Sequence, residues 1–165
     1  MTENLTPEEM IRANAELVLA FARENGGPDV GFDKRGVQWL DTYIQTLLAQ
    51  GDVEASEQLC DNLGSFLGTS IIETFGGTWQ DTEHGWAVVL EDDLAVFPFN
   101  KVYKHLTGGA GDSVLSFFDT IPALPQLTEP NAKAPAPASA DEPDEPAAAK
   151  SSSVISKLGR LFRRR

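Results

Sequence analysis

Apolar residues in the first half of the chain recur every three or four positions, which is the spacing of one face of an α-helix. The first helix is expected to start at Thr6, an N-cap whose capping-box partner is Glu9, with Pro7 at the first helical position. Its apolar stripe comprises Met10, Ile11, Ala13, Leu17, Val18 and Phe21. A second helix is expected after Asp33 and a third over residues 53–75, each ended by glycine.

Two glycines four residues apart, Gly64 and Gly68, interrupt the apolar pattern of the third helix. A glycine inside a helix costs about 1 kcal/mol relative to alanine, so two of them suggest a packing reason. They leave a strip of the helix surface without side chains. We therefore expect another element of the fold to approach the third helix closely at this strip.

After Gly77 the period of the pattern changes from helical to extended. Three short strands are expected over residues 78–80, 86–90 and 94–97. Because short turns join antiparallel strands, these form a small meander packed on the helices. One or two helical turns over residues 100–106 and a glycine-rich loop then lead to a last helix, for which Asp112 is the expected cap. The predicted fold class is α+β: N-terminal helices on a small antiparallel three-stranded sheet, with a short C-terminal helix.

Four short motifs follow one another between Gly64 and Phe118. They are GSFLG at residues 64–68, GGTW at 76–79, PFNKVYK at 98–104 and DSVLSFF at 112–118. In this order and spacing they resemble a family of uncharacterised bacterial domains, a domain of unknown function. Where the family pattern has an acidic residue after the second glycine of the first motif, this chain has Thr69. The resemblance implies the order helix, small sheet, helix, and it implies no activity.

The composition changes at the end of the region with helix and strand patterns. Residues 1–127 are predicted to form one acidic globular domain. Residues 128–153 consist mainly of Pro, Ala, Ser, Asp and Glu without an aromatic residue, which predicts a disordered linker. Residues 154–165, called the tail below, are predicted to form a basic amphipathic helix. Its apolar residues are Val154, Ile155, Leu158, Leu161 and Phe162, and its basic residues are Lys157, Arg160, Arg163, Arg164 and Arg165.

Charge is distributed unevenly along the chain, whose net charge is −12. Residues 150–165 contain six basic and no acidic residues, whereas the other 149 residues hold 7 basic against 25 acidic, a net charge of −18. So acidic a body disfavours nucleic acid as a partner. A basic amphipathic tail is typical of segments that bind an anionic membrane or a protein partner. Each cation near an anionic surface contributes about 1 kcal/mol, so the attachment of this tail to a membrane would be reversible. The alternatives are a tail that only aids solubility and a tail that folds back onto the acidic body.

Three features of the sequence bear on its compartment. Cys60 is the single cysteine, so an intramolecular disulfide is excluded. The N-terminal residues lack the basic and apolar regions of a secretory signal, and no run approaches the roughly 18 apolar residues of a spanning helix. We expect a cytoplasmic protein, peripheral at the inner membrane face when the tail binds lipid.

Residue patterns typical of metal or cofactor sites are not found, and the predicted cofactor is none. The two histidines and the cysteine do not form a ligand pair, and the acids at residues 91–93 are better explained as a solvated turn. The glycine-rich stretch at residues 108–111 lacks the Lys and Ser/Thr of a Walker loop. Lys101 and Lys104, just before it, are basic residues that could contact a partner.

Within the globular domain of residues 1–127, few residues are candidates for catalysis or for partner binding. An enzyme with an unrecognised site would need a pocket combining Glu73, Asp81 and His105, which no motif arranges. Trp79 and Trp86 are expected in the core or on a sheet face. If exposed, they would be anchors for a protein partner, since aromatic residues dominate interface energetics.

The predicted function is a non-enzymatic binding or adaptor protein. Its acidic domain would recognise a protein partner of unknown identity, and its tail would tether it to a membrane surface or a second partner. A first alternative is an immunity-like or inhibitory protein that masks a basic partner through its acidic surface. A second is an enzyme with an unrecognised site. The sequence does not determine the oligomeric state.

Overall fold

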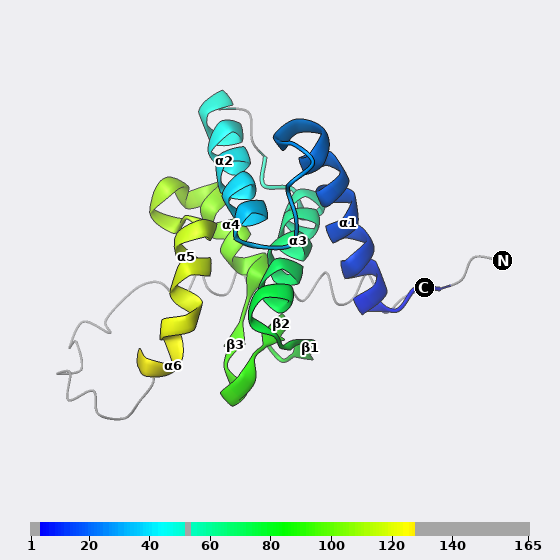
Figure 1. Ribbon diagram of the computed structural model, residues 1–165, viewed down its shortest axis with the longest axis vertical. Helices are drawn as coiled ribbons and strands as arrows, with labels where there is room; N and C mark the ends of the chain where they lie inside the picture. The colour runs from blue at the N-terminus through cyan, green and yellow to red at the C-terminus, as the bar shows by residue number, and fades with distance from the viewer. Residues whose placement is uncertain (1–3, 52–53, 128–165) are drawn as a thin grey trace.

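A computed structural model describes residues 4–51 and 54–127 of the chain (Figure 1). The predicted linker over residues 128–153 and the predicted tail helix over residues 154–165 lie outside the described residues. The elements in chain order are α1 Pro7–Gly26, α2 Lys34–Gln50, α3 Glu57–Phe75, β1 Thr78–Thr82, β2 Gly85–Val89, η1 Glu91–Asp93, β3 Ala95–Val96, α4 Pro98–Gly108, η2 Gly109–Asp112, α5 Val114–Thr120, η3 Ile121–Ala123 and α6 Leu124–Leu127. This arrangement of helices and a small sheet is an α+β fold.

The first helices begin at the caps that the sequence predicts. The Thr6 hydroxyl accepts the N–H of Glu9, whose carboxylate in turn accepts the N–H of Thr6 at 2.6 Å, so the capping box is complete. The Asp33 carboxylate accepts the N–H of Gly36 at 3.0 Å and caps α2. The third helix begins later than expected, at Glu57, because the Ser56 hydroxyl caps it by accepting a backbone N–H.

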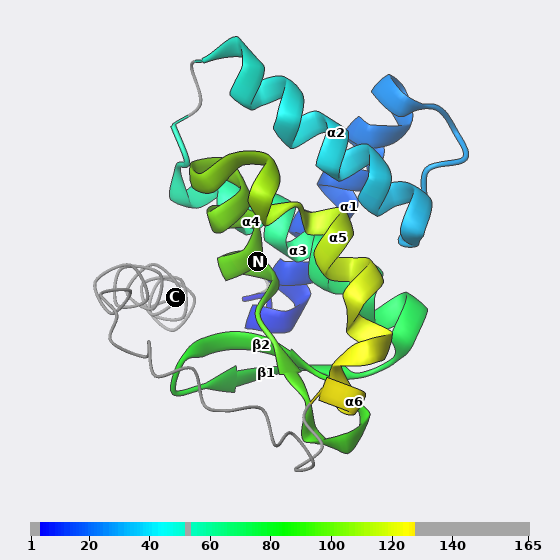
Figure 2. The ribbon, with the colours of Figure 1, turned by 90° about the vertical axis from the view of Figure 1, so that its left-hand side faces the viewer.

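Helix α3 lies in the middle of the domain, between α1 on one side and α4 on the other (Figure 1). Helix α2 packs on α3 and on α5, and α5 and α6 continue toward the end of the molecule that holds the sheet (Figure 2). The core is centred on α3, where Phe66, Leu67 and Ile71 are fully buried. Residues from the other elements that complete it include Val18, Val37, Leu40, Ile44, Val88, Val102, Leu106, Val114 and Phe118.

The sheet is the antiparallel meander expected from its short turns. Its strand order is β1-β2-β3, with Trp79 opposite Val88 and Val88 opposite Val96. Residues Trp86 to Val88 of the central strand are buried, whereas most of β1 is exposed. The sheet therefore covers one end of the helical core with its central strand, and its first strand forms an edge.

The two glycines of α3 mark the place where other elements touch this helix. A side chain at Gly64 would collide with the ring of Phe99, and one at Gly68 would collide with the ring of Trp79. The two rings pack on each other with centroids 5.4 Å apart. The expected close approach is thus confirmed, and it joins three of the four motifs quoted above: GSFLG, GGTW and PFNKVYK.

Two sequence expectations about the last third of the domain are wrong. The expected one or two helical turns are a full helix of 11 residues, α4, because Pro98 starts it and buried side chains continue as far as Leu106. Asp112 does not cap the following helix. Its carboxylate lies 3.2 Å from Nζ of Lys101, and the hydroxyl of Ser113 takes the capping role by accepting the N–H of Ser116 at 3.1 Å.

Candidate functional site

The candidate anchors on the sheet are packed inside the fold. Trp86 is 4% exposed, which confirms it as a core residue and leaves it no surface to offer a partner. Trp79 is partly buried and packs against Gly68 and Phe99. Trp79 therefore positions the sheet on α3, and the prediction that these tryptophans anchor a partner has no support from their packing.

The two candidate lysines on α4 differ in their surroundings. Nζ of Lys101 lies 3.2 Å from the carboxylate of Asp112 and 5.8 Å from the centre of the Phe117 ring. It holds the glycine-rich segment against α4. Lys104 is exposed, and its role as a partner contact stays a prediction. The candidate binding residues of the tail, from Val154 to Arg165, lie outside the described residues.

A buried polar network joins α2 to the start of α5. The Asp41 carboxylate accepts the Ser113 hydroxyl at 2.5 Å and the N–H of Leu115 at 3.2 Å. Nδ1 of His105 lies 3.7 Å from the same carboxylate oxygen and accepts the N–H of Val114 at 3.3 Å. The imidazole of His105 is 0% exposed and faces the core, so it is not part of a basic surface with Lys104.

The serine, histidine and aspartate of this network do not form a hydrolytic triad. Because Nδ1 of His105 accepts a backbone hydrogen bond, the neutral ring carries its hydrogen on Nε2, which has no partner among the described residues. The Ser113 hydroxyl donates to Asp41 and not to the histidine that would have to activate it. Burial lowers the pKa of His105, Lys101 reinforces this shift, and Asp41 and Asp112 oppose it. The network holds three elements together.

The other residues considered for catalysis are spread over the domain. Glu73 is exposed on α3, 3.9 Å from the guanidinium of Arg12. Asp81 lies on the exposed strand β1. With His105 inside the core, this arrangement does not build the pocket that the enzyme alternative needs.

Metal and thiol chemistry find no support in the part of the chain that the structure describes. No group of three or more His, Cys, Asp or Glu side chains within residues 4–51 and 54–127 is placed to hold a metal ion. Cys60 is buried, and burial together with Asp61 and Glu57 raises its pKa to about 12, so it is not a nucleophile at neutral pH.

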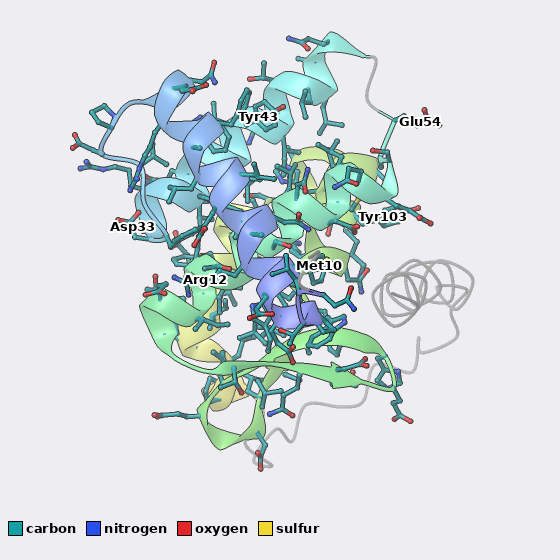
Figure 3. All side chains as sticks on the ribbon, turned by 90° about the vertical axis from the view of Figure 1, so that its right-hand side faces the viewer. Met10, Arg12, Asp33, Tyr43, Glu54 and Tyr103 are labelled. Carbon is teal, nitrogen blue, oxygen red and sulfur yellow. The ribbon has the colours of Figure 1, made fainter. Side chains whose placement is uncertain are left out.

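An apolar surface on α1 and α2 is the best candidate for a functional site. Leu17 is 66% exposed and Phe21 is 43% exposed, one helical turn apart on α1. Trp39 and Tyr43 on α2 are partly buried, and the rings of both pack against Phe21. We call these four residues the α1–α2 aromatic patch. Figure 3 looks onto α1 and labels Tyr43 on α2 and Met10 near the start of α1.

The rings of this patch are held in a fixed arrangement. Trp39 and Tyr43 are stacked, with centroids 5.1 Å apart and planes 9° from parallel. Phe21 meets both edge-on, at 6.0 Å from Trp39 and 5.5 Å from Tyr43. Trp39 also meets the core residue Phe66 at 6.2 Å. The patch is thus an ordered surface anchored to the core, and rigid aromatic groups of this kind are typical of binding hot spots.

The charges on α1 divide between its two sides. At about 100° per residue, Arg12 and Arg23 fall on the side of the helix opposite Phe21, whereas Glu24 falls within about 20° of Leu17. Arg12 pairs with Glu16 at 3.4 Å, and Nε of Arg23 donates to the carbonyl of Val30 at 3.0 Å. The charged residue that α1 places beside Leu17 is therefore acidic, while on α2 Arg35 stands one turn before Trp39 and pairs with Asp29 at 3.6 Å.

The sequence places Leu17 and Phe21 in one apolar stripe with Ile11 and Val18, but the structure leaves the first two exposed and buries the other two. The side of α1 that is buried consists of Ile11, Ala15, Val18 and Ala22, two of which are alanines. The small alanine side chains let α1 pack closely on α3, and Leu17 and Phe21 on the neighbouring side stay at the surface. The signal was present in the sequence as a second apolar stripe, Met10, Leu17 and Phe21, beside the first.

Comparisons of the chain with protein-family models, curated proteins and solved structures gave no significant match. The resemblance to a family of uncharacterised bacterial domains therefore stays a prediction that rests on the four motifs. Among the helices within the described ranges, none has the length and apolar content needed to cross a membrane.

Proposed function

We propose that this chain is a non-enzymatic binding or adaptor protein whose α1–α2 aromatic patch recognises a protein partner. The observation that carries the proposal is the 66% exposure of Leu17 and the 43% exposure of Phe21 beside two stacked rings. Neighbouring exposed apolar side chains that pack on ordered rings and are flanked by an acidic residue are typical of protein-binding surfaces. The tail supplies the tether, to an anionic membrane or to a second partner.

Crosslinking of the full chain in native extract, followed by mass spectrometry, tests whether the globular domain of residues 1–127 binds a protein partner through the patch. The wild type is compared with a Leu17→Glu, Phe21→Ser double variant and with the control Leu5→Ser, which removes an equally exposed apolar side chain (50%) before α1. Partners captured by the wild type and the control and lost by the double variant support the proposal. Equal capture by the wild type and both variants, or no capture by the wild type, contradicts it. Thermal unfolding verifies that each variant is folded.

Cosedimentation with vesicles tests the tether. The full chain is mixed with anionic or neutral vesicles at low and high salt, beside a Leu158→Asp, Leu161→Asp variant whose tail has lost its apolar stripe. Binding to anionic vesicles only, weakened by salt and absent in the variant, supports a membrane tether. If neither chain sediments with the vesicles, membrane binding by the tail is excluded, and a protein partner is the remaining role of the tail in the proposal.

The acidic surface supports a second candidate, an immunity-like protein that masks a basic partner. Residues 1–127 contain six basic and twenty acidic side chains. Association through such a surface is steered by long-range attraction and weakens steeply with salt. Capture that disappears at high salt but persists in the Leu17→Glu, Phe21→Ser variant favours this candidate over patch recognition.

A further inference from the structure

We propose that residues 154–162 of the chain's own tail dock onto the α1–α2 aromatic patch when no partner is bound. This inference rests on the proposed function and deepens it, because it names the segment that covers the partner site. The same docking would prevent the exposed aromatic patch from causing self-association. Three independent features of the molecule lead to it: apolar matching, charge and the reach of the linker.

The apolar pattern of the tail matches the patch. Ile155, Leu158 and Phe162 stand at positions i, i+3 and i+7, the spacing by which an amphipathic helix places its anchors on an apolar surface. The patch offers apolar side chains from two helices, Leu17 and Phe21 from α1 and the stacked pair from α2. A short helix lying on both can bury its stripe without a change in the domain.

Charge favours the same contact. The last sixteen residues contain six basic and no acidic residues, against six basic and twenty acidic residues in positions 1–127. Beside the patch, Glu24 lies on the same side of α1 as Leu17, while the two arginines of α1 fall on the opposite side. A basic helix whose apolar stripe faces the patch therefore meets a carboxylate at its flank and no repelling cation from α1, and the one cation that α2 places a turn before Trp39, Arg35, is paired with Asp29 at 3.6 Å.

The linker makes the contact intramolecular. The 26 residues from 128 to 153 give a root-mean-square span of about 28 Å for a flexible chain. A domain of this length has a radius of gyration of roughly 14 Å, so the tail can reach any face of it. A tether of this kind gives an effective concentration in the millimolar range. At micromolar protein, a second copy cannot compete with it, and even a millimolar contact is about half occupied.

Paramagnetic relaxation NMR on the full chain tests the docking. A nitroxide is attached to a Ser153→Cys variant, next to the tail, while Cys60 stays unlabelled because it is buried with a pKa of about 12. We expect the amide signals of Leu17, Phe21 and Tyr43 to lose about half of their intensity or more, relative to the reduced label, at a millimolar effective concentration.

Matched variants show whether the apolar stripe causes the contact. Adding Leu158→Asp and Leu161→Asp should abolish the loss of signal. The control pair Ser151→Asp and Ser152→Asp introduces the same charge outside the stripe, and the loss of signal should persist in it. No loss of signal, a loss centred on another face, or the same loss in the Leu158→Asp, Leu161→Asp variant overturns the proposal.

Failure of this inference is distinguishable from failure of the proposed function. The NMR experiment uses no partner, and the partner capture described above does not report on the tail. If the patch captures a partner but the labelled tail leaves the amide signals of the patch unchanged, the proposed function is supported and the docking of the tail is contradicted. If both hold, the Leu158→Asp, Leu161→Asp variant should capture about twofold more partner, because a half-occupied site is freed.

Discussion

The carboxylate of Asp41 on α2 accepts the hydroxyl of Ser113 at 2.5 Å, across 72 positions of the sequence. The same oxygen accepts the N–H of Leu115 at 3.2 Å, in the first turn of α5. The Ser113 hydroxyl in turn caps α5 by accepting the N–H of Ser116. One nearly buried carboxylate thus fixes where α5 begins and ties it to α2.

Removing this carboxylate should destabilise the domain. We expect Asp41→Ala to lower the free energy of unfolding by about 2–3 kcal/mol, because a partly buried hydroxyl and a backbone N–H lose their charged acceptor. Urea denaturation followed by fluorescence measures the change. The control is Asp119→Ala, which breaks the exposed ion pair with Lys34 at 2.8 Å and should cost under about 1 kcal/mol. Equal losses in the two variants would contradict a special role for Asp41.

The buried histidine is expected to lower the stability of the domain in mild acid. The pKa of His105 is lowered from 6.5 in the folded protein, chiefly by burial, so the unfolded chain binds a proton at higher pH than the folded one. The free energy of unfolding therefore keeps the full contribution of the neutral His105 above pH 6.5, and this contribution decreases as the pH falls below 6.5. In His105→Asn, whose amide oxygen can replace Nδ1 as the acceptor for Val114, this loss should be absent. Urea midpoints measured from pH 8 to pH 5 should show a steeper decline for the wild type, and parallel curves would refute the prediction.

Asp61 should make the domain more stable as the pH falls, the opposite of the effect of His105. Burial and the neighbouring Glu57 raise its pKa from 3.8 to about 7, and its Oδ1 is buried without a hydrogen-bond partner among the described residues. Above pH 7 the folded protein carries an unfavourable carboxylate, and this cost fades as the pH falls from about 7 to 4. Asp61→Asn should therefore stabilise the domain by about 1–3 kcal/mol at pH 8 and by much less at pH 4.5. Thermal unfolding at the two pH values tests it, and a pH-independent effect would disprove it.

Alanine at Gly64 should destabilise the domain although alanine is the better helix former. A Cβ at this position would lie 2.9 Å from Cα of Phe99, a backbone atom that cannot move without shifting α4. Overpacking of this kind costs about 1–3 kcal/mol, which outweighs the roughly 1 kcal/mol gained in helix propensity. Gly111→Ala is the control, because a Cβ there has no atom within 4 Å. Chemical denaturation of both variants should show a loss only at Gly64.

Much of the fold was predictable because it depends on contacts between residues close in sequence. The capping box of Thr6 and Glu9 and the cap at Asp33 are formed within four residues, so a local pattern suffices to predict them. The same holds for the antiparallel meander, whose short turns leave few other topologies. The close packing at Gly64 was also predictable, since glycines in a helix interior have a cost that only packing explains.

The tertiary structure decided what depends on residues far apart in sequence. Nothing near His105 in the chain indicates that it faces Asp41 rather than the solvent, because the partner lies on another helix. Likewise α1 has two apolar stripes, and the sequence does not say which one meets α3. The stripe that contains Ala15 and Ala22 is buried against the rest of the domain, which leaves Leu17 and Phe21 at the surface as the candidate binding site.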